Sequence, residues 1–162
     1  MKLTNFVDAV LFNLSGKTSV DYKDGLTITQ PVTAEGLTDL SLIFGAIKDK
    51  NLAGALYPYL RFDIERIERS GTATKPQSVK CFFEIGLKLE REANSNIKII
   101  EYVDAFRKWL DKSDILKLNS KPITVAGEVW TVELQYAINT QRQTVDQRFA
   151  VFQGGWKTIE TV

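Results

Sequence analysis

The longest regular pattern in the chain is an alternation of apolar and polar residues between Glu128 and Phe152. Successive side chains of a strand point to opposite faces, so a period of two predicts a strand with one oily face. The polar stretch from Thr140 to Thr144 predicts the tip of a hairpin, with arms of roughly ten residues that are about 33 Å long at about 3.3 Å per residue. The apolar face of the first arm consists of Trp130, Val132, Leu134, Tyr136 and Ile138.

Two earlier stretches predict a second antiparallel strand pair. From Leu60 to Arg69 apolar residues alternate with charged ones until the pattern slips at Ile67, which predicts a β-bulge or a bend. The next stretch, Ser78 to Glu92, also alternates apolar and polar residues. Phe82 is the exception, because it occupies a position on the otherwise polar face. Its apolar face comprises Val79, Cys81, Phe83, Ile85, Leu87 and Leu89.

The connections between these strands are weaker signals. Gly71 to Gln77 has no large apolar residue and is predicted to be a mobile loop. The stretch "DKSDILKLNSKP" is interpreted as a connector, and a small strand is predicted at Ile123 to Val125. The sequence "GGW" (Gly154 to Trp156) is expected to break the last strand.

Apolar residues recur at helical spacing in two places. The first helix is expected to begin near Thr4 and end at Gly16, and the second to begin at Ser95 or Asn96. The core-facing stripe of the second helix is Ile99, Val103, Phe106 and Leu110. A shorter helix is predicted between Leu37 and Asp49.

The predicted fold is an α+β two-layer sandwich in the order α-(α)-β-β-α-β-β. Strands that follow one another along the chain are expected to pair antiparallel, and both main helices are apolar on one side only. Those helices should therefore cover one face of a mostly antiparallel sheet.

Composition limits the classes of function. The chain has 162 residues, 44% of them hydrophobic, which predicts a single domain over residues 1–162. Its net charge of +1 argues against a nucleic-acid binder, which needs a concentrated basic face. There is no histidine, one cysteine, and no run of about 18 apolar residues, so we expect no metal, no cofactor, no disulfide and no membrane span.

Two motifs suggest chemistry and are interpreted otherwise. "LSGKTS" (Leu14 to Ser19) contains the Gly-Lys-Thr of a phosphate loop, but Leu11 stands where the second glycine belongs, and a helix precedes it rather than a strand. Gly16 is instead expected to end the first helix. Cys81 is expected to be a buried apolar residue without a base to activate it.

Taken in order, the elements resemble the tail terminator proteins of long-tailed bacteriophages, also called tail completion or minor tail proteins. The resemblance covers roughly Thr4 to Trp156, and the segment from about Lys17 to Tyr59 exceeds the minimal pattern. It is carried by the segments "TNFVDAVLFNL", "YLRFDIERIER", "VKCFFEIGLKLERE", "IKIIEYVDAFRKWL" and "VWTVELQYAIN…DQRFAVFQGGW".

The resemblance implies a structural virion protein of the tail and neck, assembled in the host cytoplasm, and not an enzyme. In that family a hexameric ring on the head-proximal end of the tail tube stops tube polymerisation and provides the head attachment surface. The implied partners are further copies of this chain, the tail tube protein and a head-completion or neck protein, with no sequence-specific nucleic-acid contact, although DNA can pass through the lumen.

The resemblance gives the long hairpin a role, because arms that project past the core of the protomer can pack on a neighbouring subunit or extend its sheet. We expect the loop residues Thr72, Thr74, Lys75 and Gln77 to contact the tube or the adjoining neck ring. The expected inter-subunit surface comprises Arg61, Asp63, Glu65, Arg66, Glu68, Gln141, Arg142 and Arg148.

Other interpretations stay open on the sequence. The charged strand Leu60 to Arg69 also fits a solvated edge, where mixed charge blocks unwanted pairing. The chain could instead be a head-completion or stopper protein, a monomeric binding module, or a small enzyme using convergent carboxylates. Trp156 fits either the core or an interface anchor.

Overall fold

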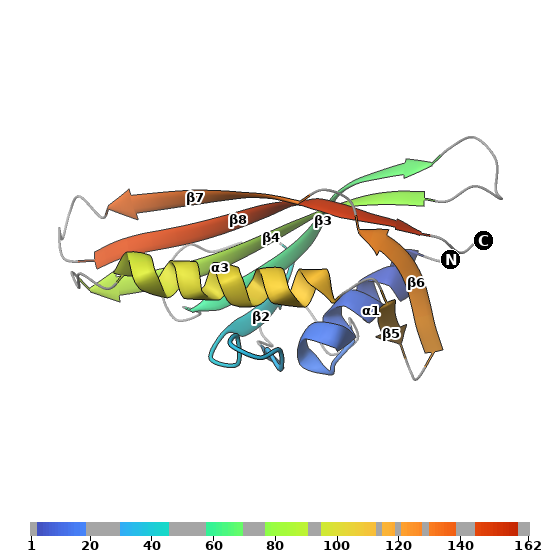
Figure 1. Ribbon diagram of the computed structural model, residues 1–162, viewed down its shortest axis with the longest axis horizontal. Helices are drawn as coiled ribbons and strands as arrows, with labels where there is room; N and C mark the ends of the chain where they lie inside the picture. Colours follow the sequence, from blue (N-terminus) through green and yellow to red (C-terminus); the bar gives the residue numbers. More distant parts are fainter. Residues whose placement is uncertain are drawn as a thin grey trace.

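The computed structural model is one twisted sheet with two helices against the same face (Figure 1). It describes residues 3–18, 30–45, 58–69, 77–90, 95–112, 115–118, 121–127, 130–138 and 145–158. The elements are α1 (Leu3–Ser15), β1 (Gln30–Pro31), β2 (Ser41–Phe44), β3 (Tyr59–Arg69), β4 (Gln77–Glu90), α3 (Ser95–Asp111), β5 (Ile115–Leu118), β6 (Lys121–Gly127), β7 (Thr131–Ile138) and β8 (Val145–Thr158).

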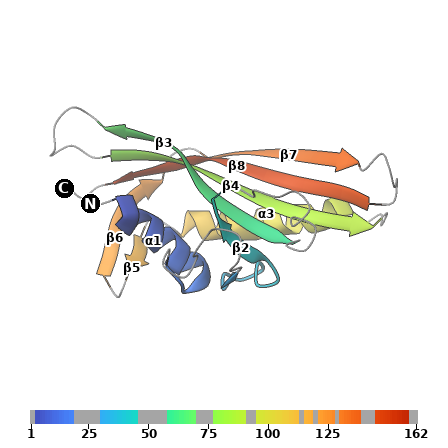
Figure 2. The same cartoon turned by 180° about the vertical axis from the view of Figure 1, so that it is seen from behind.

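The sheet has the strand order β1-β2-β3-β4-β8-β6-β5, and β7 also pairs with β8. Every described pairing is antiparallel except that of β2 with β3. Figures 1 and 2, seen from opposite sides, both place α1 and α3 on one side of the sheet. The predicted α+β class is confirmed. The predicted element order holds only in part, because β2 takes the place of the short helix, β1 precedes it, and β5 and β6 come before β7 and β8.

Strand β8 pairs with three strands, β4, β6 and β7. One of its edges pairs with β4 from Lys157↔Ser78 to Val145↔Glu90. Its other edge is shared: β6 pairs with its last residues, and β7 pairs with its first part, from Gln153↔Thr131 onward. The hairpin of β7 and β8 is therefore part of the protomer's own sheet, and the expectation of arms that project past the core is wrong.

The "GGW" sequence does not break β8, which continues through both glycines to Thr158. A Cβ on Gly155 would lie 2.1 Å from the carbonyl oxygen of Val79, and one on Gly154 would lie 2.5 Å from the Trp130 ring. These glycines permit close packing where β7 gives way to β6 along the β8 edge. The predicted break is corrected on this ground.

The two main helices agree with the helical spacing. Helix α1 ends at Ser15, and Gly16 follows it at φ 73° with its N–H donated to the Phe12 carbonyl at 2.7 Å. A left-handed residue after a helix is the usual place for glycine, so the "GKT" sequence is a helix terminus here. In α3 the predicted stripe is buried, and Tyr102 extends it.

The short helix predicted between α1 and β3 is wrong over the described residues 37–45. Instead of a helix from Leu37 to Asp49, residues Ser41–Phe44 form β2, parallel to the start of β3. Leu42 and Ile43 are both buried although they point to opposite sides of the strand. A strand that is buried on both faces shows no alternation of apolar and polar residues. A short apolar run of this kind cannot be distinguished by its sequence pattern from part of a buried helix.

Three smaller predictions have different outcomes. The phase slip in β3 is a register shift between Ile64 and Arg66, so the predicted bulge is confirmed. The predicted connector after α3 contains strand β5, which pairs with β6 and lies beside α1. The predicted strand at Ile123 to Val125 lies within β6.

The core is an aromatic cluster between the sheet and α3. Phe83 lies at its centre, stacked on Phe62 at 4.9 Å between ring centroids and packed on Phe106 at 4.8 Å. Trp156 meets the Phe83 ring edge-on at 6.0 Å and is fully buried. Trp156 is thus a core residue, and the interface-anchor alternative is excluded for it.

Candidate contact surfaces

The outer edge of β7 is the most unusual surface on the helix side of the sheet. Val132 and Leu134 are register partners of the buried Phe152 and Ala150, so all four side chains point toward the helix layer. Val132 nevertheless remains 41% exposed and Leu134 55% exposed. Helix α3 packs on β8 and leaves these two β7 side chains uncovered. The apolar face predicted for this strand is confirmed for these residues, and it is only partly buried.

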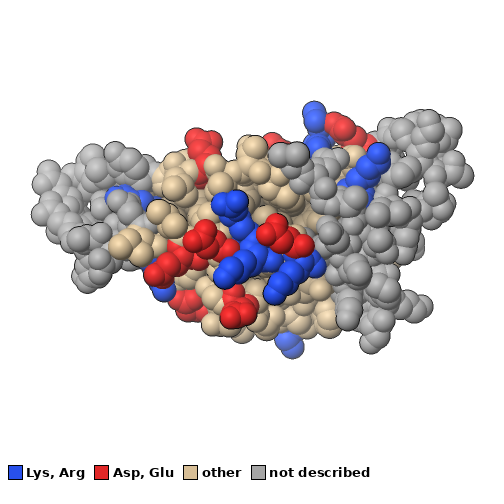
Figure 3. Space-filling view, in the orientation of Figure 1, with Lys and Arg blue, Asp and Glu red and all other residues tan. Residues whose placement is uncertain are grey.

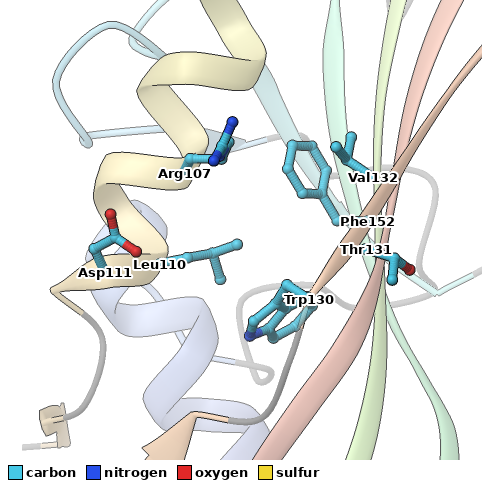
Figure 4. Close-up of a pocket in the computed structure, with 7 residues that line it drawn as sticks. All are labelled: Arg107, Leu110, Asp111, Trp130, Thr131, Val132 and Phe152. Atoms are coloured by element: carbon cyan, nitrogen blue, oxygen red, sulfur yellow. The ribbon is translucent and has the colours of Figure 1, made fainter.

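A hollow of about 390 Å³ separates α3 from the start of β7 (Figure 4). From the helix, Leu110 and Arg107 point toward the strands, and Asp111 also lines the hollow. From the sheet, Trp130 and Phe152 form the opposite wall. The hollow thus continues the uncovered apolar strip of β7 toward the core.

The face of the sheet away from the helices carries a polar network centred on Glu84. The Tyr59 hydroxyl donates to Glu84 Oε1 at 2.7 Å, and Arg61 Nε lies 3.4 Å from the same oxygen. The Arg61 guanidinium also lies over the Phe82 ring at 4.7 Å from its centroid. These contacts tie β3 to β4 across the open face and orient Arg61 within its own protomer.

Gly86 makes this network possible. It is the register partner of Tyr59, and a Cβ there would lie 2.3 Å from the Tyr59 ring. The ring lies across the glycine and is only 2% exposed, although it is on the face without helices. Sequence reasoning missed this pair, and its signal was a lone glycine inside a strand of large residues.

The second half of β3 is the other exposed edge. Strand β2 pairs with β3 only from Tyr59 to Phe62, and no described strand lies beside β3 from Asp63 to Arg69 on that side. Ile67 in this half is 39% exposed, and its register partner is the buried Val79. We call Asp63–Arg69 the β3 free edge and Thr131–Ile138 the β7 free edge.

The predicted interface residues are only partly brought together. On β3, Arg61, Asp63, Arg66 and Glu68 point to the open face, and Glu65 lies at the bulge. Arg66 pairs with Glu68 of the same chain at 2.6 Å, with both side chains more than half exposed. Arg148 is the register partner of Leu87 and is half-buried on the helix side, apart from this group.

The remaining predicted contact residues fall largely outside the described residues. Gln141 and Arg142 lie outside them, as do Thr72, Thr74 and Lys75. Gln77 begins β4 as the register partner of Arg69.

The chemistry of the described side chains is that of packing and ion pairing. Cys81 is fully buried, and burial raises the pKa of its thiol far above the ordinary value. The Glu84 carboxylate is held by Tyr59 and Arg61. Among the described residues no group of three or more His, Cys, Asp or Glu side chains could hold a metal.

The exposed side of α3 mixes both signs of charge, as the central part of Figure 3 shows. Its exposed charged residues are Lys98, Glu101, Asp104, Arg107, Lys108 and Asp111, and Lys112 follows the helix. Such interspersed charge suits a solvated surface, in contrast with the apolar strip on β7. No helix in the described part of the chain is long and apolar enough to cross a membrane.

Taken together, the surfaces offer two strand edges with exposed apolar residues and one hollow beside the β7 edge. Strand edges present unpaired N–H and C=O groups that can bind another strand. No protein-family model and no curated protein matches the chain.

Proposed function

We propose that this protein is a bacteriophage tail terminator: a structural subunit that forms a ring, with a hexamer as the expected size, on the head-proximal end of the tail tube. The ring stops tube polymerisation and presents the surface to which the filled head attaches. The single observation that carries the proposal is the β7 free edge, where Val132 and Leu134 stay exposed beside a hollow on the core side of the sheet.

An uncovered edge of this kind favours self-association. Exposed strand edges are a liability that monomeric proteins blunt with charge, bulges or a covering element. On β7, the described exposed positions include one charged residue, Glu133, and two large apolar ones. Burying those two against another subunit would remove apolar surface from water, at about 25 cal/mol per Å² buried.

The mechanism of capping is one of shape. A cyclic ring is built from heterologous contacts, in which two different patches of each subunit meet around an axis. A tube grows because the upper face of each newly added ring is identical to the upper face of the ring below it. Each addition therefore recreates the binding surface for the next ring. A terminator ring matches the tube on one side only, so growth stops without any covalent step.

The partners follow from this arrangement. Identical subunits meet at the edges of the sheet, while the two ends of the ring meet the tail tube protein and a head-completion or neck protein. The segment from Gly71 to Gln77 remains our candidate for the tube or neck contact.

Electron microscopy tests the proposal. The purified protein, alone and mixed with tail tubes from the long-tailed phage that encodes it, should give six-fold rings or capped tube ends. Leu134→Arg should abolish both the rings and the capped tube ends, because it places a charge on the β7 free edge. The variant should still fold, since the Leu134 side chain is 55% exposed.

Ile97→Arg is the matched control. Ile97 is 57% exposed near the start of α3, away from the β7 edge, so this variant should still form rings. If the unmodified protein remains monomeric at every concentration and leaves tube ends uncapped, the proposal is wrong. Equal loss in both variants would show that any added charge prevents assembly, and the β7 edge would then no longer support the proposal.

A further inference from the structure

We infer that the first part of the β7 free edge, Thr131 to Tyr136, pairs with the β3 free edge of a second copy of this chain, in an antiparallel extension of the sheet. The inference rests on the proposed function, since it names the two different surfaces that join one subunit to the next. The ring would then contain one continuous sheet, with the helices on one side of it and the open face on the other.

Both edges lack a second strand within the described residues. Strand β7 pairs with β8 alone, and β3 has no partner other than β4 beyond Phe62. Each edge also exposes an apolar residue on the helix side of the sheet, Val132 on β7 and Ile67 on β3. A joint between the edges would satisfy backbone groups and bury apolar surface in one step.

Strand direction favours this joint. The strands β3, β4, β8 and β7 alternate in direction, because each consecutive pair is antiparallel. The repeating unit has an even number of strands, so β7 placed beside the next subunit's β3 continues the alternation. All subunits then point the same way, which cyclic symmetry requires when the strands run roughly along the ring axis.

Charge selects the register. With Val132 opposite the neighbour's Ile67, Glu133 lies opposite the neighbour's Arg66 on the open face. A slip of two residues would place Leu134 opposite Ile67 and Glu133 opposite Glu68. Opposite charges across a strand pair stabilise it and like charges destabilise it, so the first register is favoured.

The offset between the edges agrees with a closed sheet. Within one subunit, the register partners across β7, β8, β4 and β3 are Thr131, Gln153, Phe82 and Asp63. In the favoured register, Thr131 instead lies opposite the neighbour's Glu68. Asp63 and Glu68 pair with Phe82 and Ser78 of β4, so the stagger is four residues over four strands. At about 3.3 Å per residue and about 4.8 Å between strands, it gives a strand tilt of roughly 35°, at the lower end of the usual range for closed barrels.

Disulfide cross-linking tests the contact. Val132→Cys and Ile67→Cys, made separately and mixed under oxidising conditions, should give covalent dimers, and neither variant alone should. Both positions are exposed, so the variants should fold; the native Cys81 is fully buried. The variant that carries both cysteines should give a series of covalently linked oligomers, the largest of which is the closed ring. Leu134→Cys with Ile67→Cys should react on the order of tenfold more slowly, because diagonal neighbours are too far apart for an unstrained disulfide.

Charge exchange tests the register independently. Glu133→Arg should weaken subunit association roughly two- to fivefold, and adding Arg66→Glu in the same chain should restore it. Association measured by concentration-dependent light scattering gives the readout, and circular dichroism checks the fold. An unrestored double variant counts against the register.

The outcomes separate the inference from the function. Rings or capped tubes without cross-links between the two introduced cysteines would overturn the inference and leave the terminator function standing. Dimers formed by Val132→Cys alone would indicate a two-fold contact of identical edges and would overturn the inference as well. Absence of rings, capped tubes and cross-links would overturn both.

Discussion

The two strands of the C-terminal hairpin differ sharply in burial although they share one face. On β8, Ala150, Phe152 and Trp156 are essentially inaccessible to solvent. On β7, the direct register partners of the first two, Leu134 and Val132, are about half exposed. The difference arises because α3 packs along β8 and the Phe106 ring meets Phe152 edge-on at 4.6 Å.

This comparison shows that an apolar face on a strand does not establish what covers it. The alternation of β7 is as regular as that of any buried strand, yet the helix layer ends before reaching it. An apolar face without its own helix is the kind of surface that another subunit can cover.

The largest expected effect is on the buried strand. Phe152→Ala should destabilise the protein by about 3–5 kcal/mol, because it leaves a cavity in the aromatic cluster. Leu134→Ala should cost about 1 kcal/mol or less in the monomer, where the side chain is already half in water. Urea denaturation of both variants at low protein concentration measures the difference, and similar losses would show that β7 is covered after all.

A smaller effect is expected at the two glycines where β8 passes from β7 to β6. Gly155→Ala brings a methyl group against the backbone oxygen of Val79, which cannot move without disrupting the β4–β8 pairing, and should cost roughly 2–4 kcal/mol. The atoms nearest to a Cβ on Gly154 belong to the Trp130 ring, so Gly154→Ala strains side-chain packing rather than the β4–β8 backbone pairing and should cost about half as much. Thermal unfolding ranks the two, and the reverse order would contradict this account of the close packing.

The smallest expected effect is a pH dependence of the stability that arises from Tyr102, on the buried side of α3. Burial, and then the hydrogen bond that its hydroxyl donates to Asp39, raise the pKa of Tyr102 above the ordinary value. As pH rises past about 10, the unfolded chain therefore loses this proton before the folded chain does, and stability falls by at most about 1.4 kcal/mol per pH unit from this group.

Tyr102→Phe isolates that contribution. The variant should lose stability less steeply above pH 10 than the parent protein, as followed by urea denaturation at a series of pH values. Cys81, whose pKa is also raised, is present in both proteins and so cancels in the comparison. Parallel curves would show that Tyr102 ionises alike in the folded and unfolded states.

Much of the local structure was predictable because its causes are local. The bulge of β3 follows from a phase slip, and the end of α1 follows from a glycine placed after a helical stripe. The strip of candidate residues on β3 was predictable for the same reason, since a period of two places Arg61 and Asp63 on one face. The loop and hairpin-tip candidates other than Gln77 lie outside the described residues, so their roles stay predictions.

What required the tertiary structure was every feature that depends on a distant partner. The parallel pairing of β2 with β3, the full-length pairing of β8 with β4, and the shielding of Tyr59 by its position across Gly86 each join segments far apart in the chain. The sequence by itself determined where most of the strands and both main helices form and which side of each is apolar, because those properties arise from nearest neighbours and backbone geometry. Only the tertiary structure decided that α3 covers β8 and leaves β7 bare, because the reach of a helix across a sheet is set by packing between elements.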